Sequence, residues 1–247
     1  VDADNTLLLI HGWGSNATTW AAHVKPLARR FRVIAVDLRG HGSSGTGPAG
    51  SGTVSRLAQD LAELLARVHA QRVIAIGHSM GGTVATILAV ERPDLIVGLV
   101  VVDPAYGAEP DEMLTVDRRL AECTESGGLE PARTIANAFS PGADPRLVIA
   151  ARHNVLGTPR DALATGFASM YLGPQAFGSV DSARIYLARR RRPVLAIYPS
   201  ESRAKTDRST DTDDLTVVIA RVASHFLHEE DPEWFVDLVS EWTLSLT

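Results

Sequence analysis

The sequence predicts an α/β fold with a mostly parallel central sheet flanked by helices. Short apolar runs rich in Val, Ile and Leu alternate with segments of helical periodicity, and the runs lack the polar alternation of half-exposed strands. Strands that are apolar on both sides are typical of parallel sheets covered on both faces. With 247 residues, 45% of them hydrophobic, the chain fits one large domain with a substantial core.

Six segments are expected to be strands: residues 6–10, 31–36, 73–76, 95–102, 194–197 and 217–222. Helical patterns lie between them. Residues 54–68 carry one apolar stripe, and the segment that begins at Pro232 repeats Trp234, Leu238 and Trp242 at i, i+4 and i+8. Strands that alternate with helices imply crossover connections and therefore a parallel sheet.

Residues from about 104 to 190 interrupt this alternation. Helical stripes continue there without a convincing strand, and Gly127-Gly128 and Ser140-Pro141-Gly142 break them. We therefore expect a core made of residues 1–103 and 191–247. Residues 104–190 would form a helical cap, or lid, inserted above the sheet.

The composition argues against several classes of function. A formal net charge of -5 disfavours a nucleic-acid partner, and the arginine run 189–192 is expected to be a solvated helix end. The single cysteine, Cys123, excludes an intrachain disulfide and suits a reducing compartment. No membrane-length apolar stretch or signal peptide is visible. We expect a cytoplasmic protein that acts on a small molecule, without a membrane partner; the sequence predicts no oligomeric state.

The segment Gly77-His78-Ser79-Met80-Gly81 matches G-x-S-x-G between a strand and a helix. Glycines are needed on both sides of the serine because the turn is too sharp for side chains to pass the neighbouring backbone. Such a turn exposes the serine Oγ at the carboxyl end of the strand, among backbone N–H groups. Ser79 is therefore the candidate nucleophile.

The segment His11-Gly12-Trp13-Gly14 ends the first strand in the same manner. A backbone turned outward there offers the Trp13 N–H to a developing oxyanion, together with the N–H of Met80. The Trp13 side chain would then face the pocket.

His225 lies in the loop between the last expected strand and the terminal helix, from which it can reach the same edge of the sheet. It is the candidate general base. His228 is expected to pack or cap near the last helix, since no third ligand has the spacing of a metal site. The G-x-G-x-x-G match at residues 45–50 does not follow a strand and contains Pro48, so a nucleotide site is not expected.

Four segments together resemble the landmarks of the α/β-hydrolase superfamily, in its order and roughly its spacing: HGWG, DLRGHGSS, GHSMGG and SHFLHEEDPEWF. The resemblance covers nearly the whole chain and implies an α/β-hydrolase fold with a variable cap at residues 104–190. The antiparallel hairpin that usually opens such domains is missing or trimmed.

The resemblance leaves the catalytic acid open. Many relatives read Gly-x-x-Asp after the strand at 193–197, whereas Ser202 stands at the matching position here. Zearalenone-type lactonases and cofactor-free dioxygenases place the acid after the preceding strand, where Asp103 follows Ser79 by 24 positions. Asp103 is therefore favoured over Glu201 and over Asp207, which lies in a polar stretch. The serine nucleophile excludes dehalogenases and epoxide hydrolases of this fold.

The resemblance implies a serine hydrolase that cleaves a carboxylic ester or lactone of a hydrophobic small molecule through an acyl-enzyme, with no cofactor and no metal. Besides Trp13, apolar cap residues are expected to bind the substrate: Phe139, Phe167, Met170 and Tyr171. One alternative is a cofactor-free dioxygenase in which His225 deprotonates a hydroxylated heterocycle. Another is a ligand receptor that keeps the triad and signals through its lid. The sequence does not identify the ester.

Overall fold

The computed structural model describes residues 5–210, 212 and 214–246. Six strands form one sheet in the order β2-β1-β3-β4-β5-β6, and every neighbouring pair among them is parallel. The strands are β1 (Thr6–Ile10), β2 (Arg32–Val36), β3 (Val73–His78), β4 (Ile96–Val102), β5 (Val194–Tyr198) and β6 (Leu215–Ile219). The predicted α/β class and parallel sheet are confirmed.

The last strand differs from its prediction, which placed it at residues 217–222. Leu215 pairs with Val194, and Ile219 pairs with Tyr198. The strand ends where β5 ends, and the Ala220 N–H makes the final bond to the Tyr198 carbonyl at 2.8 Å. Because β6 lies at the sheet edge and is only partly buried, its boundaries depend on its partner more than on its own apolar run.

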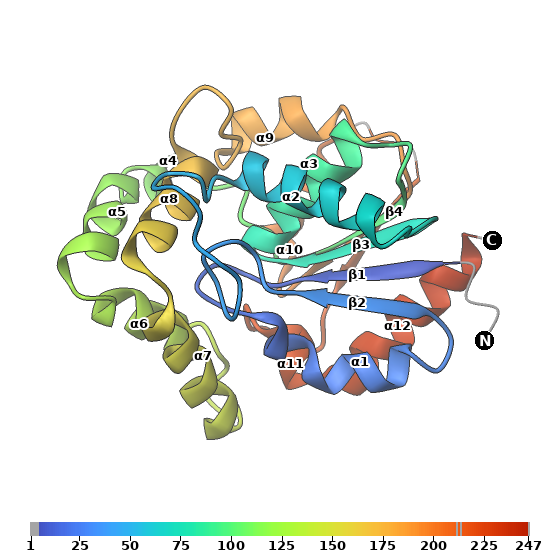
Figure 1. Ribbon diagram of the computed structural model, residues 1–247, viewed down its shortest axis with the longest axis horizontal. Helices are drawn as coiled ribbons and strands as arrows, with labels where there is room; N and C mark the ends of the chain where they lie inside the picture. The colour runs from blue at the N-terminus through green and yellow to red at the C-terminus, as the bar shows by residue number, and fades with distance from the viewer. Residues whose placement is uncertain (1–4, 211, 213, 247) are drawn as a thin grey trace.

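Helices cover both faces of the sheet (Figure 1). Helices α2 (Val54–Arg67), α3 (Met80–Glu91) and α9 (Val180–Leu187) lie on one face. Helices α1 (Ala21–Leu27) and α12 (Pro232–Ser245) lie on the other and contact each other. Each face has its own apolar cluster, which explains why the central strands are buried on both sides.

Helix α12 packs two neighbouring strips of residues against the core. Its most deeply buried residues are Phe235, Val239 and Thr243, while Trp234, Leu238 and Trp242 are partly buried beside them. Both sets recur every four residues, so they lie on neighbouring strips of one helix. Spacing alone did not show which strip is more deeply buried.

The region between β4 and β5 contains six helices: α4 (Pro110–Met113), α5 (Val116–Glu125), α6 (Leu129–Ala136), α7 (Pro145–Gly157), α8 (Arg160–Tyr171) and α9. Helices α5 to α8 lie beyond one end of the sheet, on the side opposite the chain termini (Figure 1). They pack mainly in pairs, α5 with α8 and α6 with α7, and α8 also contacts α2. Helix α9 instead packs beside α10 (Glu201–Arg208), which follows β5.

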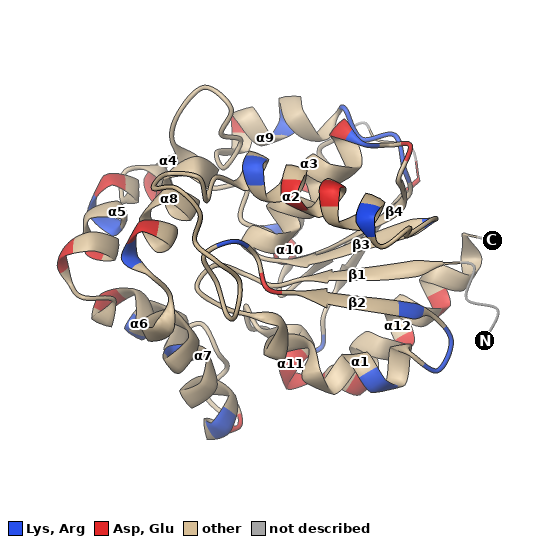
Figure 2. Cartoon of the chain, in the orientation of Figure 1, with Lys and Arg blue, Asp and Glu red and all other residues tan. Residues whose placement is uncertain are grey.

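Charged residues of both signs are mixed over the helices in Figure 2, including α2, α5 and α9. Such a surface is unlike the one-sided basic face of a nucleic-acid-binding domain. Within the described ranges, no helix is both long enough and apolar enough to cross a membrane.

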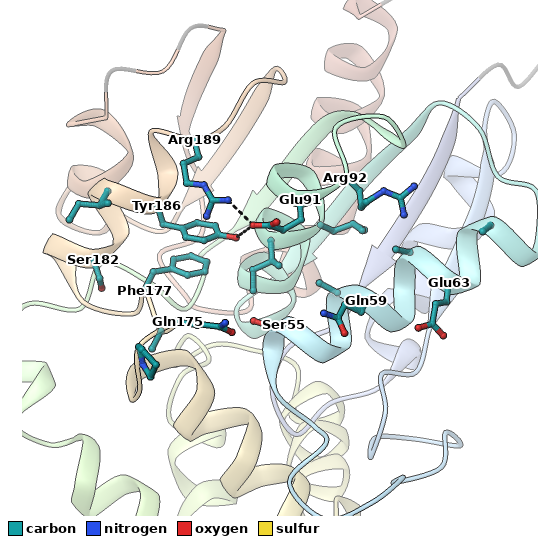
Figure 3. A pocket seen from close by; sticks show the side chains of 18 residues that line it. Ser55, Gln59, Glu63, Glu91, Arg92, Gln175, Phe177, Ser182, Tyr186 and Arg189 are labelled. Atoms are coloured by element: carbon teal, nitrogen blue, oxygen red, sulfur yellow. Dashed lines mark hydrogen bonds and ion pairs between the residues drawn. The ribbon is translucent and has the colours of Figure 1, made fainter.

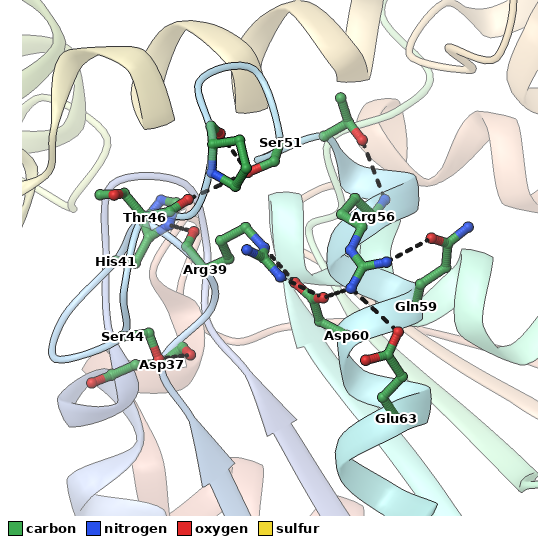
Figure 4. A network of polar contacts seen from close by, with 12 residues as sticks. Asp37, Arg39, His41, Ser44, Thr46, Ser51, Arg56, Gln59, Asp60 and Glu63 are labelled. Carbon is green, nitrogen blue, oxygen red and sulfur yellow. Dashed lines mark hydrogen bonds and ion pairs between the residues drawn. The ribbon is translucent and has the colours of Figure 1, made fainter.

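The loop after β2 is held by a network of polar side chains (Figure 4). Asp37 accepts hydrogen bonds from the backbone N–H groups of Ala17 and Ser43, both at 2.8 Å. Arg39 forms a bidentate pair with Asp60 of α2 at 2.7 and 2.8 Å. These bonds occupy the acid and the arginine of the loop within the protein itself.

A buried ion pair joins α9, α10 and β5. Arg190 donates to the Asp207 carboxylate at 2.5 Å, and both side chains are almost completely inaccessible. The hydroxyls of Tyr106 and Tyr198 donate to the same carboxylate. Burial and the nearby Asp207 raise the pKa of both tyrosines, so they remain neutral donors. The expectation of a solvated helix end was therefore wrong for Arg190, although Arg189 and Arg191 are exposed. Asp207 lies in a polar segment, as expected, but its side chain is buried in α10.

Replacing Asp207 by Asn is expected to destabilise the protein strongly, because the Arg190 guanidinium would stay buried without its counter-charge. Breaking a buried pair in this way costs about 3–5 kcal/mol. Urea unfolding of the variant measures the loss. Glu201→Gln is the matched control on the same helix, since Glu201 is exposed and pairs with Arg208 at 2.9 Å, and we expect a change under about 0.5 kcal/mol. Equal losses in the two variants would contradict this account.

Candidate active site

Ser79 lies in a strained turn between β3 and α3, with φ 54° and ψ -119°. The neighbouring glycines make this turn possible. A Cβ at Gly77 would come within 2.1 Å of the Gly81 carbonyl oxygen, and one at Gly81 within 2.3 Å of the Ile10 carbonyl oxygen. A non-glycine residue at positive φ is uncommon and tends to occur at functional sites.

The register of the sheet brings three chain segments together at this point. Ile10 of β1 pairs with Gly77 of β3, and His78 pairs with Val102 of β4. The residues that follow these strands therefore emerge side by side at the carboxyl edge of the sheet. One of them is Asp103, which has a positive φ of 36°.

Asp103 and His225 are in direct contact. The His225 Nδ1 lies 2.6 Å from the Asp103 Oδ2. The backbone holds both residues, since the Asp103 N–H donates to the Ile197 carbonyl at 2.8 Å and the His225 N–H donates to the Ala138 carbonyl at 3.1 Å. The His225 carbonyl in turn lies 2.8 Å from the His78 Nε2.

The environment keeps the Asp103 carboxylate ionised. The side chain is only 5% exposed, and burial alone would raise its pKa. The hydrogen bond and charge of His225, followed by those of Arg203, outweigh burial and lower the pKa below its usual value. Since an ionised carboxylate can only accept, the Nδ1 of His225 is the donor in their hydrogen bond.

The three competing carboxylates are now clearly separated. Asp103 contacts His225, whereas Glu201 is exposed and pairs with Arg208 and Asp207 is buried against Arg190. Of these three carboxylates, the one that directly follows the central strand β4 contacts the histidine.

Ser79 and His225 line one small cavity, of about 10 Å³, roughly the size that admits one water molecule. Its walls come from the loop after β1, from the Ser79 and His225 loops, and from three residues of α6 and α7: Ile135, Ala151 and Val155. Helices α6 and α7 thus close over the serine.

Trp13 also lines this cavity, and its indole Nε1–H donates to the Leu163 carbonyl of α8 at 2.8 Å. Met80 is the first residue of α3 and is fully buried. Backbone N–H groups in the first turn of a helix have no acceptor within that helix. The Met80 N–H therefore starts the helix next to Ser79 without an intrahelical partner.

The four aromatic or sulphur-containing cap residues named from sequence lie outside the walls of this cavity. Phe139 stacks on Phe226 with ring centroids 4.0 Å apart. Phe167 is buried between Trp13 and Tyr171, at 6.0 and 5.1 Å, and Met170 is 3% exposed. In the structure the three aromatic rings among them pack against neighbouring aromatic residues, including Trp13 and Phe226 of the cavity walls.

A much larger cavity, of about 890 Å³, lies between α2, α3 and α9 (Figure 3). Two of its charged side chains, Arg189 and Glu91, pair with each other at 2.8 Å, while Glu63 pairs with Arg56 and Arg92 with Asp94. Neither Ser79 nor His225 lines it. Choosing the cavity with the larger volume would therefore miss the cavity that Ser79 and His225 line.

Comparison with known proteins identifies the family of this chain. A family model described as "Alpha/beta hydrolase family" matches residues 7–238. The chain belongs to the alpha/beta hydrolase family. Among the described residues of this hydrolase, no group of three or more His, Cys, Asp or Glu side chains could hold a metal ion.

Relatives of this hydrolase include a Rhizobium rhizogenes protein that carries the name "Putative carbamate hydrolase RutD", 33% identical over 51% of this chain and 47% of its own length. A pimeloyl-(acyl-carrier protein) methyl ester esterase from Pectobacterium carotovorum is 35% identical over 49% of each chain. The chain thus spans about half the length of these two relatives. A solved thermophilic esterase from Thermogutta terrifontis has a TM-score of 0.85 at 24% identity, covering 99% of this chain and 91% of its own.

Several histidines near the site of this hydrolase are buried, and of these only His228 was expected to pack. His11 donates from Nδ1 to the Gly12 carbonyl at 2.7 Å and accepts from the Leu38 N–H at 3.0 Å, which fixes the neutral tautomer. Burial lowers its pKa to about 3. His23, His78 and His228 are also buried, and burial lowers the pKa of each. The sequence around a lone histidine does not show whether its side chain is buried.

We expect the hydrolase to lose stability as the pH falls below about 6.5. The unfolded chain takes up protons on these histidines near that pH, whereas the folded protein does not, so the free energy of unfolding falls with falling pH. His11 alone contributes a loss of about 1 kcal/mol between pH 6.5 and 5.5. Glu229 opposes the trend by at most one proton, because burial raises its pKa to about 8.

Urea unfolding at several pH values measures this proton uptake. His153→Asn, on an exposed position of α7, is the control and should leave the slope unchanged. A net uptake below one proton per molecule at pH 5.5 would argue against a set of neutral buried histidines.

Proposed function

We propose that this protein is a serine hydrolase that cleaves a carboxylic ester or lactone of a hydrophobic small molecule through an acyl-enzyme intermediate. The observation that carries the proposal is the contact of 2.6 Å between Asp103 and His225, in a cavity that His225 shares with the strained Ser79. An ordered acid, base and nucleophile at one sheet edge is the arrangement needed for acyl transfer.

In this mechanism His225 donates its Nδ1–H to Asp103, so Nε2 carries the lone pair. Nε2 takes the proton of Ser79 as Oγ attacks the substrate carbonyl, and Asp103 stabilises the imidazolium that forms. The imidazolium then protonates the leaving alcohol oxygen. Water attacks the acyl-enzyme with His225 again as the base, which frees the acid and restores Ser79.

The backbone N–H groups of Trp13 and Met80 would hold the oxyanion of the tetrahedral intermediate. Met80 supports this role because its N–H begins α3 beside the nucleophile. Trp13 supports it because it follows β1 at the same edge and lines the Ser79 cavity. The Trp13 indole is tied to α8, so the position of the cap is linked to this part of the site.

Residues 104–190 would act as the cap that admits and shapes the substrate. The cap contributes apolar side chains to the cavity, from Ile135, Ala151 and Val155, which favours an uncharged substrate near the serine. Because the closed cavity holds about one water molecule, α6 and α7 must move before an ester can enter. The same movement would give a bound substrate access to Phe139, Phe167, Met170 or Tyr171.

The relatives support hydrolysis at a carbonyl carbon, since one is named for a methyl ester and another for a carbamate. We further propose a cytoplasmic location. Cys123 is buried and unpaired, and burial raises its pKa to about 11, so it is a poor nucleophile and suits a reducing compartment.

The test is a screen of purified protein against aryl esters, lactones and carbamates of increasing apolar size, with oxygen consumption recorded in parallel on hydroxylated heterocycles. We expect turnover of uncharged esters or lactones and no oxygen uptake. Oxygen uptake without ester turnover would replace the hydrolase by a dioxygenase. Tight binding with almost no turnover would indicate a receptor.

A further inference from the structure

We propose that Arg203 is a positioning residue of this site, which holds the Asp103 carboxylate on the side away from His225 and makes the imidazole harder to protonate. The inference rests on the proposed function, because it concerns the base of that reaction. Arg203 has no place in the motifs by which the nucleophile, the histidine and the acid were found.

The two partners of Asp103 bind different oxygens of its carboxylate. His225 contacts Oδ2 at 2.6 Å, and the Arg203 Nε donates to Oδ1 at 3.1 Å. A carboxylate with one bonded oxygen can still rotate about its Cβ–Cγ bond. With both oxygens held from different elements, its plane is fixed, and so is the direction in which it presents Oδ2 to the imidazole.

The fold places Arg203 at this point. Strand β5 pairs with β4, so α10, which follows β5, begins next to the end of β4 where Asp103 lies. Ser200 caps this helix and accepts a hydrogen bond from the Arg203 N–H at 3.4 Å. The arginine is therefore in the first turn of a capped helix, with its backbone constrained.

Burial gives the contact its strength. The Asp103 side chain is 5% exposed and that of Arg203 is 34% exposed. A buried carboxylate needs partners for both oxygens, and a neutral imidazole supplies only one N–H. Arg203 supplies the second donor and a full positive charge, and it is among the causes that lower the pKa of Asp103.

The same charge acts on His225 through the shared carboxylate. A cation on one oxygen weakens the attraction of the carboxylate for a proton on the imidazole, and it repels the imidazolium directly. Other groups near His225 are His78 and His228, both with lowered pKa. Glu112 of α4 lies 3.8 Å from the Arg203 Nη1 and offsets part of its charge. Arg203 remains the cation bound to the acid itself.

Loss of this charge has a predictable direction. Without the guanidinium the imidazole binds a proton more readily, so the neutral base exists only at higher pH. The acid limb of the activity profile should therefore move to higher pH. A purely structural role, such as anchoring α10 to the sheet, would lower stability and leave the position of the limb unchanged.

The experiment compares wild type, Arg203→Gln, Arg203→Lys and Arg208→Gln. The rate at which an organophosphonate labels Ser79 is measured by intact-mass spectrometry from pH 5 to 9, which needs no knowledge of the natural substrate. Arg208 is the control, because it lies on the same helix, is exposed and pairs with Glu201.

We expect the midpoint of the limb to rise by about one pH unit in Arg203→Gln, so that labelling falls about tenfold on the acid side and much less above the limb. Lysine at this position restores the charge and should return the midpoint towards the wild-type value. Arg208→Gln should match wild type. An unchanged midpoint in a folded Arg203→Gln protein, judged by its melting temperature, would overturn the role of Arg203. Absence of labelling in the wild type would overturn the proposed nucleophile, and the inference with it.

Discussion

Replacing Ser79 by Ala is expected to lower kcat by about 10⁵-fold or more on any ester that the wild type hydrolyses. The reason is that no other hydroxyl occupies the turn from β3 to α3, where Oγ can meet both the carbonyl carbon and His225. The melting temperature should barely change, since alanine fits the same backbone with one atom fewer. Steady-state kinetics and intact-mass detection of a phosphonate adduct measure the two consequences.

Ser15→Ala is the matched control for this experiment. Ser15 lines the same cavity, but its Oγ is engaged with the Thr19 hydroxyl at 2.5 Å. We expect the Ser15 variant to keep most of its activity and to be labelled once, at Ser79. Full activity in the Ser79 variant would end the acyl-enzyme mechanism.

Replacing Asp103 by Asn is expected to lower kcat by about 10⁴-fold while the protein stays folded. Two losses combine. The amide cannot stabilise the imidazolium with a negative charge, and if its NH₂ group faces His225 the ring is pushed into the tautomer that leaves no lone pair on Nε2. Arg203 also loses its counter-charge, so a moderate fall in melting temperature should accompany the change.

Glu201→Gln separates this role from a general effect of removing a carboxylate near α10. Glu201 is 67% exposed at its side chain and contacts Arg208 rather than His225. We expect near wild-type kcat for it. If instead this variant is the crippled one and the Asp103→Asn protein turns over normally, the acid lies in the later loop and Asp103 only supports its turn.

Hydrophobic patterns in the sequence predicted those strands and helices whose burial depends on neighbouring residues in the chain. The central strands are apolar on both sides wherever they are placed, so β1, β3 and β4 were found within a few residues. The edge strand β6 lies at other residues than predicted because it is only partly buried and its limits come from pairing with β5. Helix α7 has no clear apolar stripe in the sequence, because Val155 is the one fully buried side chain among its residues. Its position over the serine depends on contacts between distant segments, which hydrophobic periodicity does not show.

The same division holds for the candidate site. Ser79 could be predicted because the glycines that the turn requires lie within one five-residue motif. Asp103 could be predicted because it follows a strand that is visible in the sequence. Arg203, by contrast, contacts an acid 100 positions away, and His78 contacts the His225 backbone across 147 positions. An arginine one position after Ser202, shortly after a strand, was visible in the sequence. Only the pairing of β4 with β5 shows what it contacts.

That pairing also bears on how the chain acquires activity. Strands β1 to β4 are linked by short crossovers, whereas β4 and β5 can pair only after residues 103–193 close the longest loop in the sheet. Closing a longer loop costs more chain entropy, and contacts distant in sequence form late in folding. A folding intermediate that holds β1 to β4 would carry Ser79 and Asp103 but not His225 or Arg203. A chain with the proposed mechanism would therefore become active only when residues 194–247 have docked onto β4.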